Sequence, residues 1–308
     1  MTSTKSNTLS LTGFAVTFLG AVLFSTKAII VKKAFHDTHI DALSLLAVRM
    51  IFSLPFYVGI AIFTGNKKGN TRFTGQQWCW VIALGLFGYY ISSFLDFAGL
   101  QYVSAGLERL ILFLYPTFAV LINAMVFKQK ISKIQLLALL LTYSGIAIAY
   151  IGQLNVDTAS HAFFLGSFLI FLCAITYAVY IVGSGKLIPQ VGATKFTAYA
   201  MLASTAGVFI HYTAAGDYQL LQSGTAYWGY GILLAILATV IPSFLISYGM
   251  KQIGSNNVAI VSGIGPVSTI IQAHFVLGEK IFPEQIAGTL LVIAGVLLIG
   301  WKSKPVPE

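Results

Sequence analysis

The chain has 308 residues, of which 57% are hydrophobic and only 9% are charged. Soluble domains carry about 25% charged residues and disordered chains are poor in apolar ones, so this composition excludes both classes. The net charge of +9 would suggest a nucleic-acid partner in a soluble protein. In so apolar a chain it indicates membrane orientation instead, because basic residues accumulate in cytoplasmic loops.

Ten apolar stretches approach the length of about 20 residues that a helix needs to cross the hydrocarbon core. Their apolar residues run continuously rather than alternating, which favours helices over the strands of a membrane barrel. The sequence therefore predicts an all-α polytopic membrane protein with no room for a folded soluble domain. The predicted spans are 11–31, 42–63, 78–97, 104–127, 134–152, 162–183, 196–212, 227–249, 255–277 and 284–301.

The distribution of lysine and arginine between these spans predicts the orientation. With the N-terminus in the cytoplasm, the opposite side holds only Lys32, Lys33 and Lys280. We therefore expect a multi-pass protein of the cell (inner) membrane with both termini in the cytoplasm. The expected cytoplasmic basic residues are Lys5, Lys67, Lys68, Arg72, Lys128, Lys130, Lys133, Lys186, Lys195, Lys251, Lys302 and Lys304.

The second half of the chain aligns with the first at an offset of 150 residues. Five spans per half is an odd number, so the second half enters the membrane from the opposite side. We expect two inverted five-helix repeats, 1–152 and 153–308, an arrangement typical of secondary transporters with the substrate near the repeat interface. The aligned pairs include Gly99 with Gly249, Pro116 with Pro266, Gly145 with Gly295 and, after a slip of three residues, Gly13 with Gly166.

Several local motifs resemble one known family over nearly the whole chain. They are the first-helix stretch Phe24-Ser25-Thr26-Lys27, Arg49 in the second span, and the blocks around Pro116 and Pro266, which lead into Lys128-Gln129-Lys130 and Gly278-Glu279-Lys280. In these features the chain resembles the EamA-type family of the drug/metabolite transporter superfamily. The resemblance implies ten helices in two repeats, and transport of amino acids, other metabolites or drugs, which in this family is often outward. The first repeat departs from the family pattern at Gln129, where an acidic residue is common.

Five charged side chains stand out within the predicted spans, where charges are costly and indicate function by default. Lys27, Asp96, Glu108 and Arg109 fall in the outer half of the membrane, and Arg49 lies closer to the midplane. Their clustering in one repeat predicts a charged, hydrated cavity. Four of them also have a structural interpretation: Lys27 could extend to the outer interface, Arg49 could be a fixed ion-pair partner, Asp96 could be an interfacial cap near the end of its span, and Glu108 could complement a helix dipole.

Further pathway and hinge candidates follow from helical spacing. Tyr89 and Ser93 fall on the Asp96 face of their span, and polar residues of span 255–277 give that helix a polar side. Proline in a spanning helix frees a backbone carbonyl, which favours bending. The pathway candidates are Lys27, Arg49, Tyr89, Ser93, Asp96, Glu108, Arg109, Tyr115, Ser262, Gln272 and His274, and the hinge candidates are Pro116, Gly263, Gly265 and Pro266.

We expect a secondary active transporter, an exporter of a small polar metabolite such as an amino acid, working by alternating access. The chain contains no nucleotide-binding loop and none of the common hydrolase or zinc motifs, so we expect no enzyme activity, catalytic residue, metal or cofactor. The expected partners are a small-molecule substrate, the lipid bilayer and a proton or counter-ion, without nucleic acid. The alternatives are a lipid-linked sugar flippase of the same fold and a membrane-embedded lipid-modifying enzyme.

Overall fold

The computed structural model describes residues 11–66, 72–128, 133–154, 161–215, 226–246, 248–249, 252 and 261–301. All regular structure in this part of the chain is helical, and a helix occupies each of the ten predicted ranges. The elements are α1 (Leu11–Thr38), α2 (Ala42–Gly65), α3 (Gly75–Gly85), η1 (Leu86–Ile91), α4 (Ser92–Leu100), α5 (Ala105–Leu112), α6 (Tyr115–Phe127), α7 (Lys133–Leu154), α8 (His161–Val191), α9 (Ala193–Ala215), α11 (Ala226–Ala235), η2 (Ile236–Val240), α13 (Ile264–Gln272), η3 (Ala273–Leu277) and α14 (Pro283–Trp301).

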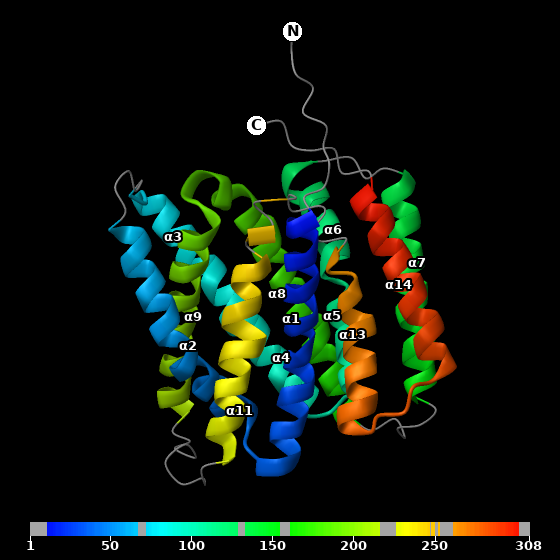
Figure 1. Ribbon diagram of the computed structural model, residues 1–308. Coiled ribbons are helices and arrows are strands. Elements are labelled where there is room, and N and C mark those ends of the chain that lie inside the picture. The colour runs from blue at the N-terminus through cyan, green and yellow to red at the C-terminus, as the bar shows by residue number, and fades with distance from the viewer. Residues whose placement is uncertain are drawn as a thin grey trace.

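The helices form a single bundle in which α1 lies at the centre, between α11 and α13 (Figure 1). Six helical stretches within the described residues are long and apolar enough to cross a membrane, and two shorter apolar helices accompany them. The chain is therefore a multi-pass membrane protein. The start of α1 and the end of α14 lie on one side of the bundle, which we call the termini face (Figure 1). The side on which α1 ends and α14 begins is the far face.

Polar residues at helix starts explain where several helices begin. The Asp41 carboxylate accepts a hydrogen bond from the Ser44 amide at 2.8 Å, which caps α2. At the start of α3, Thr74 and Gln77 form a reciprocal capping box. Ser104 caps α5 by accepting from the amide of Leu107 at 3.2 Å. Each cap satisfies amides that a helix leaves unpaired at its N-terminus, which hydrocarbon cannot do.

Three spans of the described chain contain a π-helical turn, η1 after α3, η2 after α11 and η3 after α13. A π-turn adds one residue to the helix and so rotates the following face by about 100° relative to a regular helix. Tyr89 lies within η1, whereas Ser93 and Asp96 lie in α4. The predicted polar stripe assumed one regular α-helix, and η1 interrupts that regularity between Tyr89 and Asp96.

The two proline blocks lie at helix starts. The span predicted at 104–127 is divided into α5 and α6, and Pro116 occupies the first turn of α6, where proline costs no hydrogen bond. Pro266 likewise lies in the first turn of α13, which Gly263 precedes as N-cap. Both prolines therefore follow an interruption in their span rather than bending a continuous helix.

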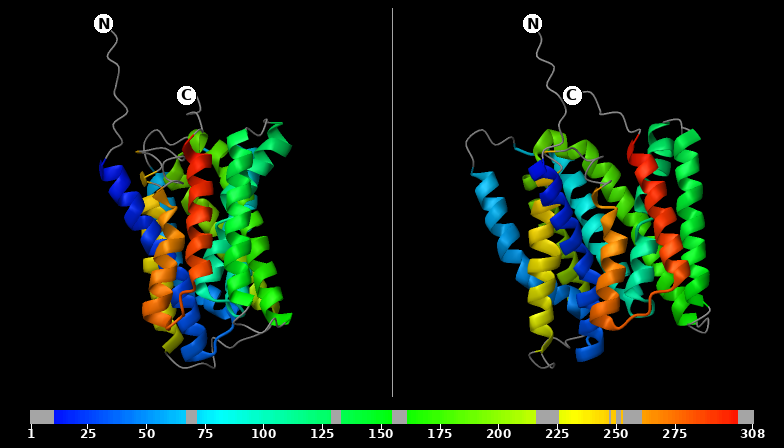
Figure 2. Two further views of the ribbon diagram at one scale, coloured as in Figure 1. Left: turned by 90° about the vertical axis from the view of Figure 1, so that its right-hand side faces the viewer. Right: turned by 45° about the vertical axis from the view of Figure 1, so that its right-hand side comes forward.

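Helices α7 and α14 pack chiefly on each other at one edge of the bundle (Figure 2). Their contact is made by backbone: a Cβ at Gly145 would lie 2.5 Å from the Gly288 carbonyl oxygen, and one at Gly288 would lie 2.4 Å from that of Gly145. A Cβ at Gly295 would lie 2.7 Å from the Ala138 carbonyl oxygen. Small residues at membrane helix contacts allow this close approach, which dispersion forces then stabilise.

We expect Gly288→Ala to destabilise the protein by about 1–3 kcal/mol, because the added methyl group must push α7 away. Thermal unfolding of the detergent-solubilised protein, followed by size-exclusion chromatography, would show a lower midpoint. Gly59→Ala is the matched control, since a Cβ at Gly59 meets nothing within 4 Å. Equal midpoints for the two variants would contradict the proposed packing.

Candidate functional site

The centre of the bundle contains an ion pair between α1 and α4. The Lys27 Nζ atom lies 2.6 Å from an Asp96 carboxylate oxygen, and the two residues are 6% and 0% exposed. Lys27 faces protein because it follows Gly13 and Gly20 at seven-residue intervals, and a Cβ at Gly20 would already lie 3.0 Å from the Leu245 Cβ. Lys27 therefore does not extend to the outer interface.

Glu108 extends this pair onto α5. Its side chain is fully buried and its carboxyl group interacts with that of Asp96. Neither Glu108 oxygen has a hydrogen-bond donor among the described residues. Two carboxyl groups thus share one lysine in an apolar interior, an arrangement in which adding or removing one proton changes the local charge balance.

Arg109 connects α5 to α1 and α13. Its guanidinium donates to the Ser25 hydroxyl at 3.5 Å and lies over the Phe24 ring, 5.6 Å from the centroid. A Cβ at Gly265 would lie only 2.9 Å from the guanidinium, so a side chain at this position would have to displace Arg109. Ser25 in turn donates to the Gly265 carbonyl oxygen at 3.3 Å, and the Thr269 hydroxyl donates to the Ser25 carbonyl oxygen at 3.4 Å.

Arg49 on α2 has a different environment. It is 4% exposed, its guanidinium lies over the Phe97 ring at 5.1 Å, and Asp96 and Tyr57 lie within electrostatic range. Its Nε atom has no hydrogen-bond partner among the described residues. A buried arginine with an unused donor can bind a carboxylate or phosphate, since the guanidinium matches those groups in geometry.

A row of tyrosines borders the charged residues. The Tyr115 ring meets that of Tyr177 edge-on at 5.0 Å, and Tyr177 stacks on Tyr180 at 5.7 Å. The Tyr180 and Tyr89 hydroxyls are hydrogen-bonded at 2.8 Å. The row therefore runs from α6 through α8 to η1, with both Tyr115 and Tyr177 within electrostatic range of Arg109.

The structure divides the predicted pathway residues into two groups. Lys27, Asp96, Glu108, Arg109 and Arg49 come together, and we call these five residues the charge cluster. The other predicted residues lie around or away from it: Ser93 and Ser262 are half-buried, Gln272 donates to the Ser268 hydroxyl at 2.8 Å, and His274 is exposed near the far face, where its Nδ1 lies 2.9 Å from the Glu279 carbonyl oxygen.

Three residues around the charge cluster were not among the predicted site residues. Ser25 and Thr269 hold α1 against α13, and the Cys173 thiol on α8 lies within electrostatic range of four cluster residues. Ser25 adjoins Lys27 in the Phe24–Lys27 motif, so its position offered a signal. Cys173 offered none, because a cysteine in an apolar span is ordinarily a packing residue.

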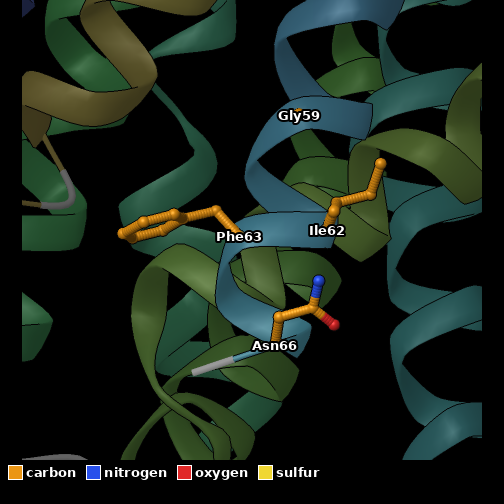
Figure 3. A pocket seen from close by; sticks show the side chains of 4 residues that line it. All are labelled: Gly59, Ile62, Phe63 and Asn66. Atoms are coloured by element: carbon orange, nitrogen blue, oxygen red, sulfur yellow. The ribbon is translucent and has the colours of Figure 1, made fainter. Parts of the chain in front are cut away.

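A surface groove on α2 is separate from the charge cluster (Figure 3). It is lined by Gly59, Ile62, Phe63 and Asn66, of which Ile62 and Phe63 are exposed. Phe63 lies about 21 Å along the helix from Arg49, at 1.5 Å per residue. In a membrane protein such an apolar groove on an outer helix faces lipid.

The charge cluster suits electrostatic recognition rather than bond-breaking chemistry. Three basic and two acidic side chains, all buried, leave one positive charge uncompensated when all are ionised. Buried charges in a membrane protein line ion or substrate pathways, because partners or water must offset their desolvation. A bundle of spanning helices around such a cluster defines a membrane transporter.

The comparisons with known proteins agree with that class. The EamA-like transporter family matches residues 11–151 and 164–301, so the chain belongs to this family. The uncharacterized transporter YcbK of Bacillus subtilis (strain 168) is 31% identical over 287 residues, covering 90% of each chain. The biotin transporter of Escherichia coli (strain K12) is 24% identical over 267 residues, covering 84% of this chain and 83% of that protein. A solved crystal structure with 16% identity matches with a TM-score of 0.65 over 96% of this chain and 98% of that chain, and so shares the fold.

We expect Lys27→Met to destabilise the protein by about 3–5 kcal/mol, because it leaves the Asp96 carboxylate buried without its lysine. The double variant Lys27→Met/Asp96→Leu should recover much of the folded yield. Both effects are measurable as monodisperse yield and thermal midpoint in detergent. Lys33→Met is the control, since the Lys33–Asp37 pair at 3.2 Å is partly exposed and water screens its attraction. A double variant no more stable than Lys27→Met would contradict this account of the pair.

Proposed function

We propose that the protein is a secondary active transporter that exports a small, carboxylate-bearing polar metabolite, such as an amino acid, across the cell (inner) membrane by alternating access. The charge cluster is the substrate site, and the termini face is cytoplasmic. The unused donor of Arg49, buried beside Asp96, carries the assignment of a carboxylate ligand. An α-amino acid also carries an ammonium group, for which the unpaired Glu108 carboxyl is the natural partner.

The glycine contacts support two inverted repeats. At the offset of 150, Gly145 corresponds to Gly295 and Gly288 corresponds to Ala138. Gly145 contacts Gly288, and Gly295 likewise contacts Ala138. The turns η1 and η2 also begin 150 residues apart, at Leu86 and Ile236. Helices α7 and α14 are the last helices of the two halves, and they run in opposite directions (Figure 1). The operation that superimposes one half on the other would therefore invert its orientation in the membrane.

A second pair of matching contacts is found between residues that align either at the offset of 150 or after the three-residue slip. A Cβ at Gly99 would lie 2.5 Å from the Ile170 Cγ1, and one at Gly249 would meet the Thr17 side chain. Gly99 aligns with Gly249 at 150 residues, while Thr17 aligns with Ile170 after the three-residue slip. The last helical turn of the third span therefore packs on α8, the first helix of the second half. In the matching contact, the end of the eighth span packs on α1, the first helix of the first half.

Transport by purified protein in liposomes tests the substrate site. We expect saturable uptake of carboxylate-bearing compounds from a panel of α-amino acids, monocarboxylates including biotin, and amines of matching size. Arg49→Gln should raise the KM at least about tenfold, because it removes a charge-assisted hydrogen bond. Arg72→Gln replaces an exposed arginine and should leave transport unchanged. Parent-like kinetics in Arg49→Gln, or a chemically altered product by mass spectrometry, would refute the proposal.

The adjacent Asp96 and Glu108 carboxyls support proton coupling. We propose that Glu108 gains or loses a proton during the cycle, because its carboxyl group adjoins that of Asp96 in an apolar interior, where each carboxylate disfavours ionisation of the other. Glu108→Gln should still exchange labelled for unlabelled substrate but should no longer concentrate it in response to an imposed pH gradient. Glu284→Gln, at an exposed acidic residue of α14, is the control. Full accumulation by Glu108→Gln would show that the proton binds elsewhere.

A further inference from the structure

The turn between α4 and α5, at the far face, is held by charged side chains from two other segments. The Lys32 ammonium of α1 donates to the carbonyl oxygens of Leu100 at 3.2 Å and Val103 at 2.9 Å. On the other side of the turn, the Glu279 carboxylate accepts from the amides of Ala105 at 2.9 Å and Gly106 at 3.3 Å. A cation thus lies at the C-terminus of α4 and an anion at the N-terminus of α5, and each complements a helix dipole.

The Glu279 contact joins the two halves of the chain. Glu279 lies between η3 and α14, and its amide donates to the Ala273 carbonyl oxygen at 3.2 Å. Beside it, the Gln285 side chain packs so closely that a Cβ at Gly106 would lie 2.2 Å from the Gln285 Nε2. The start of α5 is therefore covered on the far face by a segment of the second half.

The same turn carries the charge cluster. Asp96 lies one helical turn before the end of α4, and Glu108 and Arg109 follow Gly106 by two and three residues within the first turns of α5. From Ala105 to Arg109 is about 6 Å along the helix. A movement of the α5 N-terminus away from Glu279 would therefore carry Glu108 and Arg109 with it.

We propose that Lys32 and Glu279 form the gate of the far face, shut in this conformation, and that release of Glu279 from the α5 amides opens the charge cluster to that side. This inference rests on the proposed alternating access, but its test requires no substrate. At the offset of 150, the counterpart of Glu279 is Gln129, a neutral residue. The carboxylate is thus a feature of one gate and has no charged equivalent in the other repeat.

The native cysteines provide the measurement. In a Cys79→Ser background the one remaining cysteine is Cys173, which is 3% exposed and lies beside the charge cluster. An anionic, membrane-impermeant methanethiosulfonate is applied separately to each face of sealed vesicles, and protease cleavage of a C-terminal tag identifies the termini face. Glu279→Ala and Lys32→Met should each accelerate Cys173 modification from the far face about tenfold, with Glu279→Gln intermediate.

Matched controls lie next to both gate residues. Glu284→Ala and Lys33→Met remove the same charges from exposed positions and should leave the labelling rate unchanged. Unchanged far-face rates in both gate variants, with Cys173 fully reactive in SDS, would overturn the gate. Equal acceleration from both faces would also overturn it, because that result indicates general loosening. Far-face acceleration in a protein that transports none of the panel would uphold the gate and refute the substrate assignment.

Discussion

The requirement that a charge buried among apolar helices must find a partner determines how this bundle is assembled. The Lys27–Asp96 pair joins α1 to α4, and the neighbouring Glu108 and Arg109 add α5. Arg109 then brings in α13, because it donates to Ser25 while the Gly265 backbone packs against its guanidinium. Hydrocarbon offers no alternative hydrogen-bond partners, so the helices that carry these groups must lie at the centre, and the purely apolar faces are left for lipid.

Much of the fold could be predicted because each span has its own local signal. Continuous apolar stretches located the ten helices, and the seven-residue spacing of Gly13, Gly20 and Lys27 placed the lysine against protein. The pairing of Lys27 with Asp96 could not be predicted, since spacing along one helix says nothing about which residue of another helix lies opposite. The π-turn η1 could not be predicted either, because it is a local change in hydrogen bonding that the surrounding sequence did not indicate.

The role of Glu279 illustrates the same limit. The motif Gly278-Glu279-Lys280 was recognised as a turn that follows a proline-containing span, and nothing within the motif points to α5. Its partners, the amides of Ala105 and Gly106, lie more than 170 residues away and are backbone groups, which no side-chain pattern reveals. Helix ends attract ions through their unpaired amides and carbonyls, and only the folded arrangement shows which ends lie within reach of which side chain.

The glycine contact between α7 and α14 also bears on how such a chain could arise. In a twofold dimer the same surface patch is used by both subunits, so every contact between two residues occurs twice, with the roles of the subunits exchanged. Such a contact is called isologous. If the halves correspond at the proposed offset of 150, Gly145 with Gly288 and Gly295 with Ala138 satisfy this relation inside one chain. Two separate five-helix proteins inserted in opposite orientations would have the same surface available for association. Gene duplication and fusion would then need only a linker, because the interface would precede the covalent connection.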